Sequence, residues 1–127
     1  MLEFEKVKIL NRFYFGFTSQ GASYFFALGR QYHRAEMYFM SDEDKQKFDA
    51  MYKYKDEIEQ KIPNLVWQRL DGKKASRIKL ELTEAEKSMF RGKWGEEAYS
   101  EDLINWLADS MIKLLPVMSY YWDKVRS

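Results

Sequence analysis

The sequence predicts an α+β fold in which helices pack on one face of a five-stranded antiparallel sheet. Three observations predict it. Apolar and polar residues alternate in five short segments, the pattern of half-buried strands. Turn-forming tracts such as Asp71-Gly72 separate several of them. Two longer segments repeat apolar residues every three or four positions, as amphipathic helices do. The resulting order is β-β-β-α-β-β-α, and two apolar helix stripes beside consecutive antiparallel strands imply helices on one sheet face.

The first three strands follow from a period of two. One begins at Arg12, a second spans 24–29, and a third runs from His33 to Met40. Tight turns at Ser19–Ala22 and 29–32 join them into an antiparallel meander. The preceding stretch, Leu2–Leu10, has no clear period, and we expect a helix or an irregular entry segment there.

A single helix is predicted between the third and fourth strands. Ser41 is a suitable N-cap, the acidic residues after it favour the positive end of a helix dipole, and Pro63 marks the end. The helix is expected to bury one stripe of side chains, formed by Phe48, Met51, Tyr52, Lys55, Ile58 and Ile62.

The second half of the chain contains two more strands and two more helices. Leu65–Leu70 and Arg77–Leu82 alternate as strands, and the capping box Thr83–Glu86 begins a short helix expected to carry Met89 and Phe90. Ser100 is the expected cap of the last helix, in which Pro116 predicts a kink or a break. Its expected inner stripe consists of Leu103, Leu107, Met111, Leu114 and Met118.

Composition limits the class of protein. A chain of 127 residues is the size of one domain, 1–127, and its 17% aromatic content argues against disorder. The absence of Cys excludes disulfides and thiol catalysis. The net charge of +1 gives no strong field toward nucleic acid or anionic membranes. No apolar run approaches the roughly 18 residues that span a bilayer, and no export signal is visible, so we expect a cytoplasmic protein without a membrane partner.

Aromatic and basic residues alternate on the predicted strands, and they are candidates for binding. Such a surface suits stacking on bases and contact with phosphate, and it equally suits a protein interface anchored by Tyr and Arg. A third layer or a dimer partner that covers this face explains the pattern as well. Lys74, at the tip of the Asp71-Gly72 hairpin, adds a local positive charge. The candidates on the sheet face itself are Tyr14, Phe25, Arg34, Tyr38, Arg77 and Lys79.

Evidence for catalysis in the sequence is weak. A metal-dependent nuclease needs carboxylates and a Lys on adjacent strands, and only Glu36, Glu81 and Lys79 offer them. Ion pairs on a solvated strand face explain these residues better. No phosphate-binding glycine motif occurs, and the lone His33 is expected at a surface turn. We therefore predict no metal site and no cofactor.

Several segments together suggest a family. They are Arg34–Tyr38, Ser41-Asp42, Lys55–Glu59, Leu65–Trp67 and Ala75–Ile78. From about Phe13 onward, with these segments, Trp106 and the helix around Pro116, the chain resembles the bacterial, archaeal and phage family called domain of unknown function 4268. Members of that family often follow predicted restriction-type nuclease domains in defence-related proteins. The resemblance implies an accessory or recognition role in nucleic-acid or anti-phage biology, and it carries over no catalytic residue.

These observations favour a non-enzymatic recognition or accessory module. We expect it to bind a protein partner, or a second copy of itself, through Arg34, Tyr38, Arg77, Lys79 and Lys74. The alternative is a nucleic-acid-binding domain or a small nuclease-like enzyme. Because the net charge is only +1, nucleic-acid binding is expected to be weak.

Overall fold

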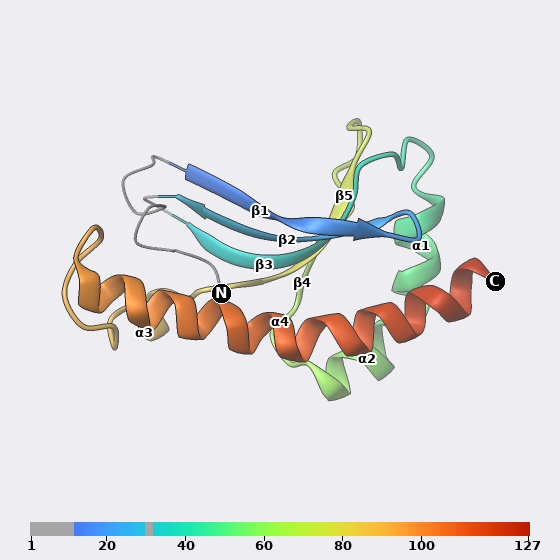
Figure 1. Cartoon of the computed structure of the whole chain (residues 1–127). Helices are drawn as coiled ribbons and strands as arrows, with labels where there is room; N and C mark the ends of the chain where they lie inside the picture. The colour runs from blue at the N-terminus through green and yellow to red at the C-terminus, as the bar shows by residue number, and fades with distance from the viewer. Residues whose placement is uncertain (1–11, 30–31) are drawn as a thin grey trace.

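A computed structural model describes residues 12–29 and 32–127, with side chains from residue 16 onward. The expectation for Leu2–Leu10 lies outside the described residues. Five strands form one antiparallel sheet in the order β1-β2-β3-β5-β4 (Figure 1). These strands are β1 (Arg12–Ser19), β2 (Ala22–Gly29), β3 (His33–Phe39), β4 (Val66–Gln68) and β5 (Ser76–Glu81).

Helices cover one face of this sheet. The longest, α4 (Glu97–Arg126), runs beneath the strands from one end of the sheet to the other, and it contacts β3 at the sheet's centre (Figure 1). Its C-terminal part is tied to the β1–β2 turn, because the Trp122 indole N–H donates to the Gln20 carbonyl at 2.7 Å. The predicted α+β class, with helices on one face, is confirmed.

The strand residues that face the helices form the core. Two apolar clusters lie between the sheet and α4, a larger one toward the C-terminal part of that helix and a smaller one toward its start. Tyr24, Met37 and Ile78, neighbours across three strands, belong to the larger cluster and are at most 2% exposed. Leu28, Tyr99, Leu103 and Leu107 form the smaller one. The strand residues between these core residues point away from the helices. The sheet face that they form is called here the outer face.

The predicted helix of residues 41–62 is two short helices, α1 (Gln46–Tyr52) and α2 (Lys55–Lys61). The buried stripe includes Phe48, Met51 and Ile58, as expected, but Tyr52 is 48% exposed, so its inclusion was wrong. Two helices follow one another because the chain turns at Lys53 and Tyr54, which allows both to contact α4.

The N-cap position of the first helix is Lys45 and not Ser41, and the Asp42 side chain accepts hydrogen bonds from free N–H groups in the first turn of the helix. The Asp42 carboxylate is buried and accepts hydrogen bonds from the backbone N–H groups of Lys47 (2.9 Å) and Phe48 (3.0 Å) and from the Ser76 hydroxyl (2.7 Å). The helix begins later than predicted because the chain first makes a turn, in which Lys45 has a left-handed backbone with φ 62°. A carboxylate near helical N–H groups satisfies donors that would otherwise lack partners.

The remaining elements follow the prediction with four corrections. The strand expected over Leu65–Leu70 is shorter, since β4 consists only of Val66–Gln68. The capping box at Thr83 is present, but α3 (Glu84–Lys87) ends before Met89, which is 83% exposed. The last helix begins at Glu97, and Ser100 lies buried inside it with its hydroxyl donating to the Glu96 carbonyl. Pro116 does not split this helix, which continues to Arg126 because buried side chains hold it to the sheet on both sides of the proline. No described helix is both long and apolar enough to cross a membrane.

Candidate functional site

Four of the five predicted binding residues lie together on the outer face. The residues are Arg34 and Tyr38 on β3 and Arg77 and Lys79 on β5. They alternate with the buried residues and so point away from α4, and they lie close together because β3 and β5 are direct neighbours. Tyr38 is paired with Arg77 across the two strands, and Lys79 is paired with Glu36. Phe25 extends this surface on β2, while the side chain of Tyr14 lies outside the described part of the chain.

A buried carboxylate organises the arginines of this surface. Glu36 is 3% exposed, and its Oε1 atom accepts a hydrogen bond from Nε of Arg34. Its Oε2 atom lies 4.0 Å from Nε of Arg77, which makes a second ion pair. A buried carboxylate is stable only when such partners compensate for its lost hydration. Glu36 therefore holds the Arg34 guanidinium by a hydrogen bond and attracts that of Arg77, whose buried Nε atom has no hydrogen-bond partner among the described residues.

Aromatic rings border the same arginines. The Arg77 guanidinium lies over the Tyr38 ring, 5.6 Å from its centroid, at a distance typical of a cation–π contact. The Phe25 and Tyr38 rings are 6.0 Å apart, tilted by 53°. Phe25 also packs over Gly16 of β1, where a Cβ atom would lie only 2.5 Å from the Phe25 ring. This contact explains the glycine in the middle of an edge strand.

Lys79 is less available than the sequence suggested. Lys79 is 8% exposed, and its ammonium group forms an ion pair with Glu81 on the same strand. Together, Arg34, Arg77 and Lys79 carry three positive charges against the two negative charges of Glu36 and Glu81. The outer face is thus a nearly neutralised network with a small excess of positive charge.

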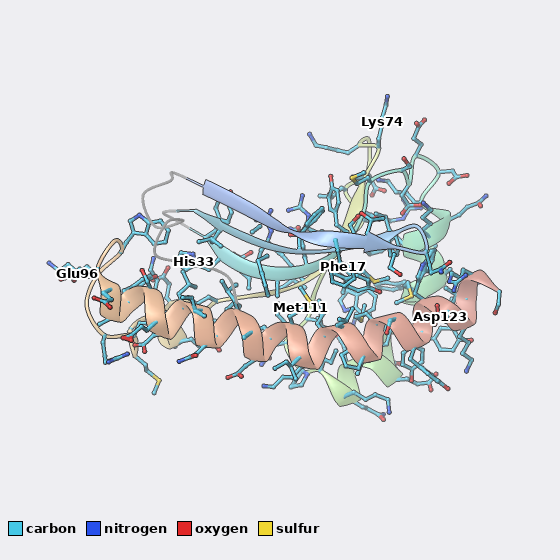
Figure 2. The ribbon with its side chains drawn as sticks, viewed as in Figure 1. Phe17, His33, Lys74, Glu96, Met111 and Asp123 are labelled. Atoms are coloured by element: carbon cyan, nitrogen blue, oxygen red, sulfur yellow. The ribbon has the colours of Figure 1, made fainter. Side chains whose placement is uncertain are left out.

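Lys74 stands apart from this network. It is exposed near the tip of the β4–β5 hairpin, which projects from the sheet on the side opposite α4 (Figure 2). The hairpin is held by the buried Lys45, whose ammonium group donates to the carbonyls of Lys73 (2.7 Å) and Ala75 (2.6 Å). Sequence reasoning missed Lys45, because nothing in a run of charged residues shows that one of them will be enclosed.

His33 is buried, which corrects the expectation of a surface turn residue. It is 2% exposed at the start of β3, facing α4, with Nε2 2.8 Å from the Tyr99 hydroxyl oxygen. The Trp94 ring stacks on it at 5.3 Å, so the Gly92–Gly95 loop closes over the imidazole. Burial lowers the pKa of His33 to about 4, helped by the charge of Lys87. A hydrogen bond with the Tyr32 backbone opposes this effect and raises the pKa slightly.

The residues considered for a nuclease site are also brought together, but with cations around them. Glu36 and Glu81 share the outer face on neighbouring strands, and each already forms an ion pair with an Arg or Lys. Within residues 12–29 and 32–127, no three His, Cys, Asp or Glu side chains gather in a way that could hold a metal ion. The geometry gives these carboxylates a structural explanation, as ion-pair partners within the sheet.

Comparison with known proteins places the chain in a family. It belongs to the family described as Domain of unknown function (DUF4268), whose model matches residues 6–121. The resemblance inferred from the sequence is therefore confirmed. Neither the curated proteins nor the solved structures contain a match to this chain.

Proposed function

We propose that this chain is a recognition domain that binds a partner protein through the outer face of its sheet. The observation that best supports this proposal is the buried Glu36 carboxylate between Arg34 and Arg77, next to the Tyr38 ring. Tyr and Arg contribute most of the energy in many protein interfaces, especially where their conformations are fixed before binding. The Arg34 guanidinium, which is already hydrogen-bonded to Glu36, lowers the entropic cost of binding.

The charge balance favours a protein over a nucleic acid. Binding to phosphates depends on free cations that displace condensed counterions. The three cations of the outer face are instead engaged by Glu36 and Glu81, which leaves an excess of one positive charge. The same excess disfavours face-to-face contact with a second copy, because like charges would meet. We therefore propose a partner whose contact surface carries carboxylates around an apolar centre.

Nucleic-acid binding is the second candidate, and one observation supports it. Lys73 and Lys74 are exposed at the hairpin that projects on the side of the outer face. If they act with Arg77, affinity for DNA will fall steeply as the salt concentration rises, by a factor set by the number of phosphates contacted. The defence-related role implied by the family resemblance fits either candidate, and a nuclease or methyltransferase gene beside this one would support it.

Photo-crosslinking tests the proposal. A photoreactive phenylalanine analogue at position 38 should crosslink an acidic protein in a lysate of the source cells, and the same analogue at the exposed Tyr120 of α4 should not. The crosslink should be lost in Arg77→Ala, and the purified chain should sediment as a monomer. Crosslinking from both positions alike, or tight and salt-sensitive DNA binding that Arg77→Ala abolishes, would overturn the proposal.

A further inference from the structure

Beyond the end of β4, no strand in the described part of the chain pairs with β5 on the side away from β3. β4 has three residues, and its last pair with β5 toward this end joins Val66 to Lys79. Continuing the ladder would place Asn64 opposite Glu81. Asn64 instead has a left-handed backbone with φ 70° and follows Pro63, which lacks an N–H group. The chain therefore leaves the sheet, and β5 continues without a described neighbour on this side.

The backbone of Glu81 faces this position. In an antiparallel pair, alternate residues direct both N–H and C=O toward the same neighbour. The Leu82 N–H donates to the His33 carbonyl at 2.9 Å, so Leu82 is directed toward β3. Glu81 is consequently directed away from β3. Among the described residues, none forms a backbone hydrogen bond with Glu81 on that side.

A groove follows the same edge. It has a volume of about 760 Å³ and lies between the end of β5, the loop before β4, and α4. Leu80 and Leu82 point toward the helix layer but are only half-buried, because no described strand covers them here. The opposite wall is formed by Trp106 and Ser110 of α4, with Lys113 at the rim. The groove therefore offers apolar contacts next to the backbone N–H and C=O of Glu81, which have no partner within residues 12–29 and 32–127.

We propose that an extended segment of a partner polypeptide adds to β5 at Glu81 and occupies this groove. Strand addition supplies affinity through backbone hydrogen bonds and specificity through pockets for alternate side chains. The residue opposite Glu81 would exchange both backbone hydrogen bonds with it. The two residues beside it would direct their side chains between Leu80, Leu82 and the Trp106 wall, so both are apolar.

The charges lining the groove favour a basic segment. Three carboxylates belong to its lining, from Glu81, Glu84 and Glu86, against two ammonium groups, from Lys79 and Lys113. Because Lys79 and Glu81 already form an ion pair, the excess of one negative charge lies with Glu84 and Glu86. The side chain opposite Glu81 lies on the same sheet face as that carboxylate, where opposite charges stabilise cross-strand pairs. The expected pattern is an apolar residue, a Lys or Arg, and a second apolar residue. This inference is independent of the proposed function, because it uses the edge of the sheet rather than Tyr38 and Arg77.

Peptide selection with a backbone control tests it. Random nonapeptides displayed on phage are selected on the wild-type chain, and the enriched sequences are synthesised. We expect enrichment of the apolar–basic–apolar pattern. N-methylation of the basic residue leaves every side chain in place but removes one hydrogen bond, and it should weaken binding about tenfold. Amide exchange of Glu81 should slow when the peptide binds.

Variants of the protein separate this site from the outer face. Glu81→Pro removes the N–H that faces the groove, together with the carboxylate and its ion pair with Lys79, and should abolish binding. Glu81→Gln retains that N–H and should retain most of the affinity. Tyr38→Ala should leave peptide binding unchanged. Failure to enrich the pattern, equal binding of the N-methylated peptide, or loss of binding in Tyr38→Ala with retention in a folded Glu81→Pro would refute strand addition.

Discussion

Acidification should destabilise this protein through His33. The imidazole is buried between Trp94 and Tyr99, and its pKa is lowered to about 4. In the unfolded chain the same group titrates at its ordinary value of about 6.5. Between these two pH values the unfolded state binds a proton that the folded state does not. Stability is therefore complete above pH ~6.5 and is lost as the pH falls toward 4.

The size of the effect follows from the shift. Each unit of difference in pKa is worth about 1.36 kcal/mol, so a lowering from 6.5 to about 4 amounts to ~3 kcal/mol. This is a large fraction of the free energy of unfolding of a typical domain, which is about 5–15 kcal/mol. The free energy of unfolding should fall by ~1.4 kcal/mol for each pH unit within this window.

Urea unfolding at several pH values between 4.5 and 7.5 measures this dependence. The lower limit avoids the titration of Asp49 and Asp102. Hydrogen bonds from Arg69 and Arg91 lower the pKa values of these carboxyl groups, so their contribution to stability is lost only at more acidic pH. His33→Gln is the control, because an amide can still bond to Tyr99 but cannot titrate. Its stability should be nearly constant over the same range.

A wild-type protein whose unfolding free energy is flat between pH 4.5 and 6.5 would refute the reasoning. So would a His33→Gln variant that retains the full slope, since another group would then be responsible. A directly measured His33 pKa near 6.5, from NMR titration of the imidazole, would show that the Gly92–Gly95 loop does not keep water from the ring.

Three further substitutions test the packing, each by chemical unfolding. Asp42→Ala should cost about 2–4 kcal/mol, because two helix N–H groups and the Ser76 hydroxyl lose their acceptor, and Asp42→Asn should recover part of that loss. Gly16→Ala should destabilise by about 1–3 kcal/mol, since its Cβ would lie 1.9 Å from the Tyr24 carbonyl oxygen; an unchanged midpoint would contradict this close approach. Ile78→Asp should prevent folding, as the residue is fully buried, and a stable variant would mean that β5 is oriented differently.

Local patterns in the sequence located all five strands, although β4 is shorter than expected, and they placed most residues of the candidate site on one sheet face. The period of two on β3 and β5 places Arg34, Tyr38, Arg77 and Lys79 on one face, and the structure has them there. That they are neighbours depends on β5 lying beside β3, which only the sheet order establishes. Lys74 was correctly expected at a hairpin tip, because the turn signal is local.

Burial of most polar groups was beyond the reach of the sequence. Glu36, Asp42 and Lys45 are nearly enclosed and belong to no apolar pattern, whereas His33, also buried, is in phase with the inward residues Ala35, Met37 and Phe39 of its strand. Each is enclosed by contacts with segments distant along the chain, as when Tyr99 reaches His33 across 66 positions. The predicted start of the first helix was wrong for the same reason. The turn before α1 is held by Asp42, which bonds to Ser76 and to the β4–β5 hairpin, both distant along the chain.

The sequence by itself determined the fold class, the alternation of strand faces, the capping box at Thr83 and the family, because all of these depend on residue types at short spacing. Only the tertiary structure decided which charges are neutralised, that Pro116 stays within one helix, and that β5 extends past β4 beside a groove. The physical reason is that hydration and pairing of a charged or backbone group depend on what the rest of the chain places next to it. Periodicity specifies a direction for each side chain, but it does not specify the neighbour that the side chain meets.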